Sequence, residues 1–334
     1  MEPGWRASTS HAEPAEITPG IWRLPVPLPG HSIGYVNSYA LIAPEGVLLI
    51  DVGWRSDESW DALDQLLRGV GSSARDVRRV LLTHFHPDHC GQAGLFVDAS
   101  IGMHPIDAGH LYDRFVDQTP YRAEMMRWVD ATGSPDAVRE VSLTQLTRSK
   151  ARVAPLVPDH LVVDGEVIKH DRWELTAFHT PGHTGGHLCF YERTSRLLFS
   201  GDHVFPHIKT SPAFRPQCSA DPVGDYLRSL TRLATLPVDL VLPGHQEPFE
   251  GFDERLGQLR QHHAERLSLC ERLVAGGAST VWEVASLVPR SRTWDQLNAA
   301  AKISSMGETY AHLVHLAATG RATREGSAPI TWGG

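Results

Sequence analysis

The stretch from Thr83 to His89 reads THFHPDH and holds four potential metal ligands within six residues: His84, His86, Asp88 and His89. Side chains two residues apart point to the same side of an extended segment, so His84 and His86 can reach a common point. Pro87 disfavours a helical backbone at His86, which supports this geometry. Four nitrogen and oxygen ligands in so short a segment fit two adjacent metal ions better than one, because a single ion would demand cramped angles.

Three more residues of ligand type stand where apolar strands are expected to end. His183 lies in the segment TPGHTGGH, Asp202 follows LLFSG, and His245 follows VLPG. Asp51 follows the apolar residues LLI in the same way. A lone histidine is usually a capped or surface imidazole. A dense cluster of ligands has no packing advantage, however, so these residues together predict a metal site at one edge of the sheets.

These motifs resemble those of the metallo-β-lactamase-fold hydrolases. The elements HxHxDH, GHTxGH, SGD and PGH occur in the order of that family across residues 21–250. The resemblance implies an α/β fold, a four-layer αββα sandwich with the metals at one edge of its two sheets. It also assigns the ligands, with His84, His86 and His183 on a first metal, Asp88, His89 and His245 on a second, and Asp202 bridging the two. In the same way it makes Asp51 a residue that orients the ligand loop.

The residue at position 202 narrows the choice among the branches of this family. The antibiotic-hydrolysing members that use a cysteine ligand have it where this chain has Asp202, so β-lactamase activity is not expected. A bridging carboxylate resembles the glyoxalase II-like thioesterases, lactonases, phosphodiesterases and ribonucleases. The flavodiiron members carry a glutamate where His86 stands, and the sulfur dioxygenases lack some ligands of the second site. The resemblance therefore implies hydrolysis.

The expected reaction is hydrolysis of a small ester-like molecule, with a thioester preferred over a lactone. Two divalent ions that share a water lower its pKa from near 16 to roughly 7 or below, which supplies a metal-bridging hydroxide at neutral pH. Asp88 is the predicted catalytic residue, because it lies beside that hydroxide and can accept its proton. Zinc suits the ligands best, and iron or manganese is compatible. The alternatives are a phosphodiesterase or endoribonuclease with the same metals, and a non-catalytic metal-containing sensor.

The order of expected elements places this site in a mixed α/β domain at 19–250. Short apolar runs predict strands at 35–42, 46–51, 79–83, 99–103, 160–163, 173–178, 187–191, 196–200 and 238–242. Residues 1–18 are expected to be a flexible lead-in. Helical patterns at 104–156 predict an insertion, which either packs on the surface or forms a lid over the substrate.

Residues 251–334 are expected to form a small, almost wholly helical domain. This segment resembles the winged-helix-like appendage of one branch of the family, which includes thioesterase-like enzymes and a ribonuclease. It carries 9 Lys and Arg against 8 Asp and Glu. Near-zero charge without a basic stripe argues against nucleic acid as the partner. A small-molecule substrate is expected, and the appendage would close the active site or form a homodimer.

The composition is consistent with a cytoplasmic globular enzyme. The 334 residues carry a formal net charge of −8, and none of the four cysteines forms a CxxC pair. Reduced thiols are therefore expected rather than disulfides. No stretch approaches the ~20 apolar residues of a membrane helix, and the first residues lack a basic-then-apolar export signal.

Several weaker signals receive no role. The GxSxG match at 30–34 lacks the strand-turn-helix context of a serine hydrolase and reads as a loop. His187 and His203 flank predicted ligands and are equally consistent with contacts to those ligands and with ordinary strand ends. Lys209 and Arg215 could meet an anionic group of the substrate, but solvated charges are the default interpretation.

Overall fold

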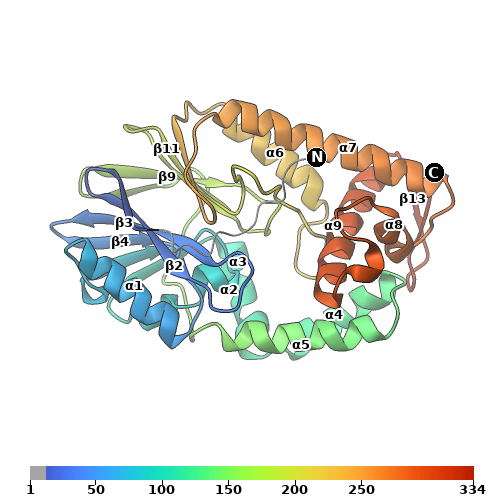
Figure 1. The fold of residues 1–334 in the computed structure, drawn as a ribbon, viewed down its shortest axis with the longest axis horizontal. Coiled ribbons are helices and arrows are strands. Elements are labelled where there is room, and N and C mark those ends of the chain that lie inside the picture. The colour runs from blue at the N-terminus through green and yellow to red at the C-terminus, as the bar shows by residue number, and fades with distance from the viewer. Residues whose placement is uncertain (1–12) are drawn as a thin grey trace.

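The computed structural model describes residues 13–334, so most of the predicted lead-in lies outside the described residues. Figure 1 shows two facing sheets at one end of the molecule and a group of helices at the other. The lead-in is shorter than predicted, because β1 (Ala15–Thr18) pairs antiparallel with β2 (Ile21–Pro27). Backbone hydrogen bonds to the edge of the sheet thus hold a polar segment that hydrophobic periodicity does not reveal.

The first sheet contains seven strands in chain order, β1 to β7. The neighbouring pairs from β1 to β4 are antiparallel, and the neighbouring pairs from β4 to β7 are parallel. The remaining strands of this sheet are β3 (Tyr35–Ala43), β4 (Gly46–Ile50), β5 (Val77–Leu81), β6 (Ser100–Met103) and β7 (His160–Leu161).

The second sheet contains five strands in the order β12-β11-β10-β9-β8, with only the β11–β12 pair parallel. Its strands are β8 (Val167–His170), β9 (Trp173–His179), β10 (Leu188–Glu192), β11 (Leu197–Gly201) and β12 (Leu240–Pro243). The sequence analysis did not predict β2 or β8.

Alternation along the strands builds four layers. In β4, Leu48 and Ile50 face the second sheet, whereas Leu49 faces α1 (Asp57–Gly69) on the outside. This follows from the two-residue period of a strand, which lets a fully apolar run serve two cores. The outer face of the second sheet is covered by α6 (Pro222–Leu233) and the start of α7 (Phe252–Ala275). The predicted αββα sandwich is confirmed.

The remaining helices belong to the insertion and the C-terminal region (Figure 1). A short α2 (Pro87–Cys90) follows β5, and the insertion contains α3 (Pro105–Leu111), a π-helical turn at Tyr112–Val116, α4 (Thr119–Ala131) and α5 (Ala137–Ala151). The C-terminal region contains α7, α8 (Val281–Leu287), α9 (Ala299–Ala318) and a hairpin of β13 (Thr323–Glu325) and β14 (Thr331–Gly333). The hairpin was not predicted.

The insertion and the C-terminal region share one hydrophobic core. Tyr121 and Trp128 of α4 are buried in the same cluster as Tyr310 of α9 and Trp332 of β14. The rings of Trp128 and Tyr310 stack with their centroids 6.4 Å apart. Aromatic side chains bury large apolar areas, so this cluster holds the two segments together.

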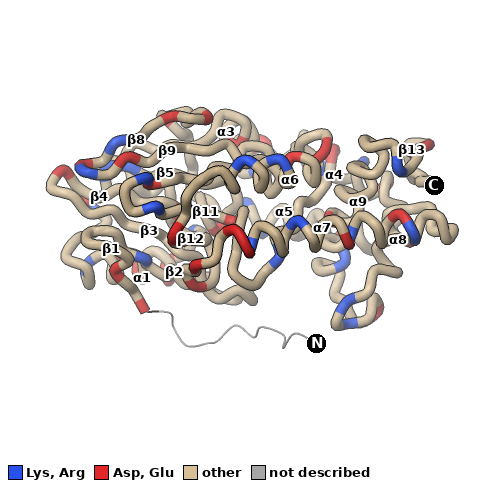
Figure 2. The backbone as a smooth tube through the Cα atoms, turned by 90° about the horizontal axis from the view of Figure 1, so that it is seen from above, with Lys and Arg blue, Asp and Glu red and all other residues tan. Residues whose placement is uncertain are grey.

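Three further expectations concern membrane helices, cysteines and charge. Within residues 13–334, no helix is both long enough and apolar enough to cross a bilayer. All four cysteines are free, as expected, and Cys90, next to the ligand cluster, is buried with its thiol 3.1 Å from the Phe85 carbonyl oxygen. Figure 2 shows that Lys, Arg, Asp and Glu are interspersed along the backbone, and the C-terminal region has no continuous basic stripe.

Candidate metal centre

The structure brings all seven predicted ligand residues together at one edge of the two sheets. They fall into two groups whose ligand atoms lie within 4.8 Å of one another: His84, His86, His183 and Asp202 in the first, and Asp88, His89 and His245 in the second. The resemblance implied the same division for the six residues other than Asp202, which it placed between the two groups.

Most of these side chains lie just beyond the ends of strands. The segment after β5 bends at Thr83 and Phe85, His86 has extended backbone angles of φ −63° and ψ 144°, and Pro87 then starts α2. Asp202 directly follows β11, and His245 follows β12 after Gly244. Because β5, β11 and β12 end at the same edge, residues far apart in the sequence meet there.

In the first group, His86 stands between its two histidine partners. Its Nδ1 atom lies 2.9 Å from Nε2 of His84 and 3.0 Å from Nε2 of His183. Oδ2 of Asp202 lies 3.4 Å from the same His183 atom. Ligands about 2.0–2.2 Å from one zinc ion lie roughly 3 to 3.5 Å apart, so these separations suit a common ion.

In the second group, Asp88 and Asp202 approach two imidazoles. Oδ2 of Asp88 lies 3.3 Å from Nε2 of His245, and Oδ1 of Asp202 lies 3.2 Å from Nε2 of His89. The two oxygens of Asp202 therefore face different groups of ligands, Oδ2 toward the first and Oδ1 toward the second.

Orphaned polar atoms test whether a cation fits here. Nε2 of His89, Nε2 of His245 and Oδ1 of Asp202 are buried without a hydrogen-bond partner among the described residues. The other ring nitrogens are held: Nδ1 of His89 lies 2.8 Å from Asp51 Oδ2, and Nδ1 of His245 lies 2.8 Å from the carbonyl oxygen of Tyr35. Buried polar atoms without partners are costly, and a divalent cation would satisfy all three at once. The donor set fits the metal that the motifs predicted.

The charges of these groups suit a cation. Burial lowers the pKa values of His84, His86 and His183, which keeps these rings neutral. Burial alone would raise the pKa of Asp202, but the imidazoles around it, His89 first, outweigh this effect and hold its pKa well below its usual range. The carboxylates around His89 and His245, Asp202 first, outweigh burial and raise the pKa values of these two rings. Because imidazole binds a metal in its neutral form, an ion in the second group would displace a proton from them.

Asp51 orients the ligand loop, as predicted. Its Oδ1 accepts a hydrogen bond from the Thr83 backbone N–H at 2.9 Å, and its Oδ2 accepts one from the Thr83 hydroxyl at 2.8 Å. The same Oδ2 binds Nδ1 of His89, so the Nε2 atom of that ring is left for an ion. Asp51 adopts a left-handed backbone with φ 57°, a conformation that is uncommon for residues other than glycine.

Sequence reasoning missed Asp107, which joins two ligand loops. Its carboxylate accepts hydrogen bonds from the Phe85 N–H, the Thr184 hydroxyl and the Gly186 N–H at 3.1, 2.8 and 2.7 Å. Burial raises its pKa to about 6. A fully buried Asp in the first turn of α3 is the only signal, and it becomes visible only when burial is known.

The structure also places the residues to which the sequence analysis assigned no role. His187 contacts a predicted ligand, because its Nε2 atom accepts from the Asp202 N–H at 3.2 Å. His203 is buried, with its ring against Tyr226 and both ring nitrogens unpartnered within the described chain. The GxSxG segment is a loop, as expected.

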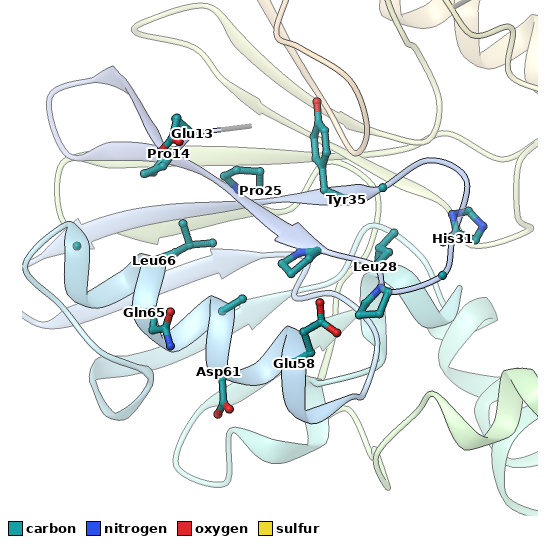
Figure 3. A pocket seen from close by; sticks show the side chains of 16 residues that line it. Glu13, Pro14, Pro25, Leu28, His31, Tyr35, Glu58, Asp61, Gln65 and Leu66 are labelled. Atoms are coloured by element: carbon teal, nitrogen blue, oxygen red, sulfur yellow. The ribbon is translucent and has the colours of Figure 1, made fainter. Parts of the chain in front are cut away.

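Two cavities lie near the centre. The larger, about 990 Å³, lies between α1 and the β2–β3 loop, and the residues that line it include Glu13, Glu58 and Asp61 (Figure 3). Neither group of ligands lines it. The second cavity, about 360 Å³, is lined by His86 and His183 themselves and extends between the insertion and α9. A substrate in this second cavity would therefore contact His86 and His183 directly.

Known proteins match this arrangement. The family model described as the metallo-beta-lactamase superfamily matches residues 32–245. Acyl-coenzyme A thioesterase MBLAC2 of Homo sapiens is 29% identical over 270 residues, which are 77% of this chain and 88% of the relative. The probable metallo-hydrolase YqjP of Bacillus subtilis is 26% identical over 248 residues, 68% of this chain and 70% of the relative.

A solved structure extends the similarity to the whole chain. A metallo-beta-lactamase family protein from Thermus thermophilus has a TM-score of 0.83 and 28% identity, and the match covers 95% of this chain and 99% of that one. The match includes the C-terminal helices, and it confirms the fold predicted from the motifs. The family match to residues 32–245, together with the two groups of ligands, shows that this chain is a hydrolase of the metallo-beta-lactamase superfamily.

Proposed function

We propose that this protein is a thioesterase that holds two divalent metal ions, with zinc in both sites. The observation that carries the proposal is the position of Asp202, whose two carboxylate oxygens face the two groups of ligands, 3.4 Å from His183 and 3.2 Å from His89. One carboxylate between two sets of imidazoles is what a pair of neighbouring ions requires. A single structural ion would leave the second set unused.

The ligand assignment follows from the two groups. His84, His86 and His183 would hold the first ion, Asp88, His89 and His245 the second, and Asp202 both. Nitrogen and oxygen donors without a thiolate suit zinc, and they also accept iron or manganese. Ions bound there would supply Lewis-acid polarisation of the substrate carbonyl and a water of lowered pKa.

Asp88 is the residue that we assign to proton transfer. Hydrolysis of a thioester forms a C–O bond from water, breaks the C–S bond, and yields a carboxylic acid and a thiol. The water proton must pass to the leaving sulfur, and a carboxylate at the reacting atoms can carry it. The imidazoles of His89 and His245 lower the pKa of Asp88 despite its burial, so this carboxylate is ionised before the reaction and would hold a transferred proton weakly enough to pass it on to the leaving sulfur.

The choice of a thioester rests on the relatives. The human and bovine proteins that match 77% of this chain are both named acyl-coenzyme A thioesterases. The carboxylate at position 202 agrees with this branch of the superfamily. We place the enzyme in the cytoplasm, because its four free cysteines suit a reducing compartment.

Metal analysis and a substrate panel on one preparation test this proposal. We expect two equivalents of zinc per chain and hydrolysis of acyl-coenzyme A thioesters, with lactones, bis(p-nitrophenyl) phosphate and single-stranded RNA cleaved slowly or not at all. Asp202→Asn should lower the activity at least ~100-fold and reduce the metal content. Asp253→Asn, an exposed acidic residue on α7, is the matched control and should change neither quantity. One equivalent of metal, or RNA cleavage without thioester cleavage, would refute the proposal.

A further inference from the structure

The second cavity contains two arginines close to the ligand groups. Arg114, from the turn before α4, and Arg215, from the loop between β11 and α6, line the same 360 Å³ space as His86 and His183. The other walls combine apolar side chains such as Tyr121 with hydroxyl and amide groups such as Ser142 and Gln145, and none of them carries a negative charge. Charged guanidinium groups are unusual in such a cavity, because burial removes their hydration.

Aromatic rings and one amide fix Arg114 in place. Its guanidinium carbon lies 3.8 Å from the centre of the Tyr121 ring and 4.8 Å from that of Phe85. Its Nε–H donates to Oε1 of Gln217 at 2.8 Å. Gln217 itself has a left-handed backbone with φ 66°, a strained conformation that the surrounding loop maintains. These neutral neighbours position the arginine but leave its charge unpaired.

Helix α9 makes room for Arg215. A Cβ atom on Gly307 would lie 3.2 Å from Nε of Arg215 and 3.3 Å from Cβ of Ala213, so the absence of a side chain there lets the guanidinium pack against the helix. Glycine inside a helix costs about 1 kcal/mol relative to alanine. The Phe214 N–H donates to the Gly307 carbonyl at 2.9 Å and fixes the loop. Within the described chain, the guanidinium makes a single long hydrogen bond of 3.5 Å, to the carbonyl of Ile303.

Neither arginine has a carboxylate partner among residues 13–334. The acidic groups nearby are engaged elsewhere: Asp107 accepts three hydrogen bonds from the ligand loops, and Asp113 accepts one from Gln217. Burial lowers the pKa of the Arg114 guanidinium, and the charge of Arg215 adds to this effect. Two neighbouring positive charges are thus kept in a partly dry cavity without a counter-ion, which is costly unless an anion binds there.

We propose that Arg114 and Arg215 form a subsite that binds an anionic group of the substrate, a carboxylate or a phosphate. Guanidinium groups bind both through paired N–H donors. This inference rests on the proposed function, because it takes the reacting carbonyl to lie at His86 and His183. The anion is either a carboxylate at the far end of the acyl group or a phosphate of the thiol component.

Two substrate pairs distinguish these sources. Glutaryl- and pentanoyl-coenzyme A differ mainly in a terminal carboxylate. Of the glutaryl thioesters of coenzyme A and of N-acetylcysteamine, only the first carries phosphates. In one of the two pairs, kcat/KM for the member with the additional anionic group should exceed kcat/KM for the other member at least ~10-fold. Arg114→Gln and Arg215→Gln should reduce that ratio at least ~10-fold, mainly through KM, and Arg215→Lys should restore part of it. The exposed Arg127 of α4 supplies the control, since Arg127→Gln should keep the wild-type ratio.

Calorimetry on chelator-treated protein tests the subsite without turnover. Glutarate or coenzyme A should bind to the wild type, and the Arg114→Gln/Arg215→Gln double variant should bind at least ~10-fold more weakly. Arginine-dependent binding in a protein that cleaves no thioester would refute the proposed function and leave the subsite standing. Thioester cleavage with no charge preference, and equal binding by wild type and double variant, would overturn the subsite alone.

Discussion

Gly244 offers the most direct test of the second group of ligands. It separates β12 from His245, and its N–H donates to the Gly201 carbonyl at 2.8 Å. Its backbone does not need glycine, since its φ lies outside the left-handed range. A Cβ atom at this position, however, would lie 2.7 Å from Oδ1 of Asp202 and 2.8 Å from Cε1 of His89. Gly244→Ala therefore places a methyl group between two predicted ligands without altering any ligand.

The size of the effect follows from these distances. Carbon and oxygen atoms in contact prefer about 3.5–4.0 Å, so Asp202 or His89 must move by roughly 0.7 Å or more. Metal–ligand distances tolerate only about 0.2 Å. We expect the second ion to bind at least ~10-fold more weakly, a loss of about 1.4 kcal/mol, while the first ion keeps its His84, His86 and His183 ligands. Overpacking should lower the unfolding free energy of the metal-free protein by about 1–3 kcal/mol.

Zinc titration against a competing chelator measures both affinities, and urea denaturation of chelated protein measures the stability. Gly257→Ala is the matched control, because a Cβ atom on this exposed helical glycine of α7 would meet no other atom within 4 Å. It should leave both zinc affinities unchanged and stabilise the helix by up to ~1 kcal/mol. Two ions bound to Gly244→Ala with wild-type affinities would show that Asp202 and His89 do not hold the second ion.

Two further predictions concern Asp51 and a buried histidine pair. Asp51→Asn keeps the left-handed backbone but replaces a carboxylate oxygen, which accepts hydrogen bonds from Thr83 and His89, with an amide group. Zinc should therefore bind ~10–100-fold more weakly in chelator competition. An unchanged zinc affinity would contradict the role of Asp51. Nδ1 of His263 lies 3.1 Å from Nε2 of His312, and burial lowers the pKa of His263 to about 2 and that of His312 to about 3. The folded state favours their neutral forms, so this contribution to stability is complete above pH 6.5 and is lost as the pH falls toward 3. The unfolding free energy of chelated protein should therefore fall by about 2.7 kcal/mol per pH unit from this pair, and the His263→Leu/His312→Leu double variant should show a correspondingly smaller slope.

The ligands could be predicted from the sequence because each one is marked locally. Spacing marks His84, His86, Asp88 and His89, and the end of an apolar strand marks the three others. Asp107 has no such mark, since its role depends on where α3 meets the loops of Phe85 and Thr184. The edge strand β1 was missed for a related reason, because its pairing with β2 rather than its own pattern holds it.

Arg215 shows why the substrate cavity could not be read from the sequence. Beside the SGD motif it could be a solvated charge or a contact to substrate, and the difference is decided by Gly307 of α9, far along the chain. The predictions placed α9 in a separate C-terminal domain and Arg114 in an insertion, whereas Tyr121, Trp128 and Tyr310 join these segments in one core. A charge held between two segments that fold against each other keeps its position when the substrate is absent. In our proposal the cavity is therefore a preformed site, whose specificity would depend on the C-terminal helices as much as on the ligand loops.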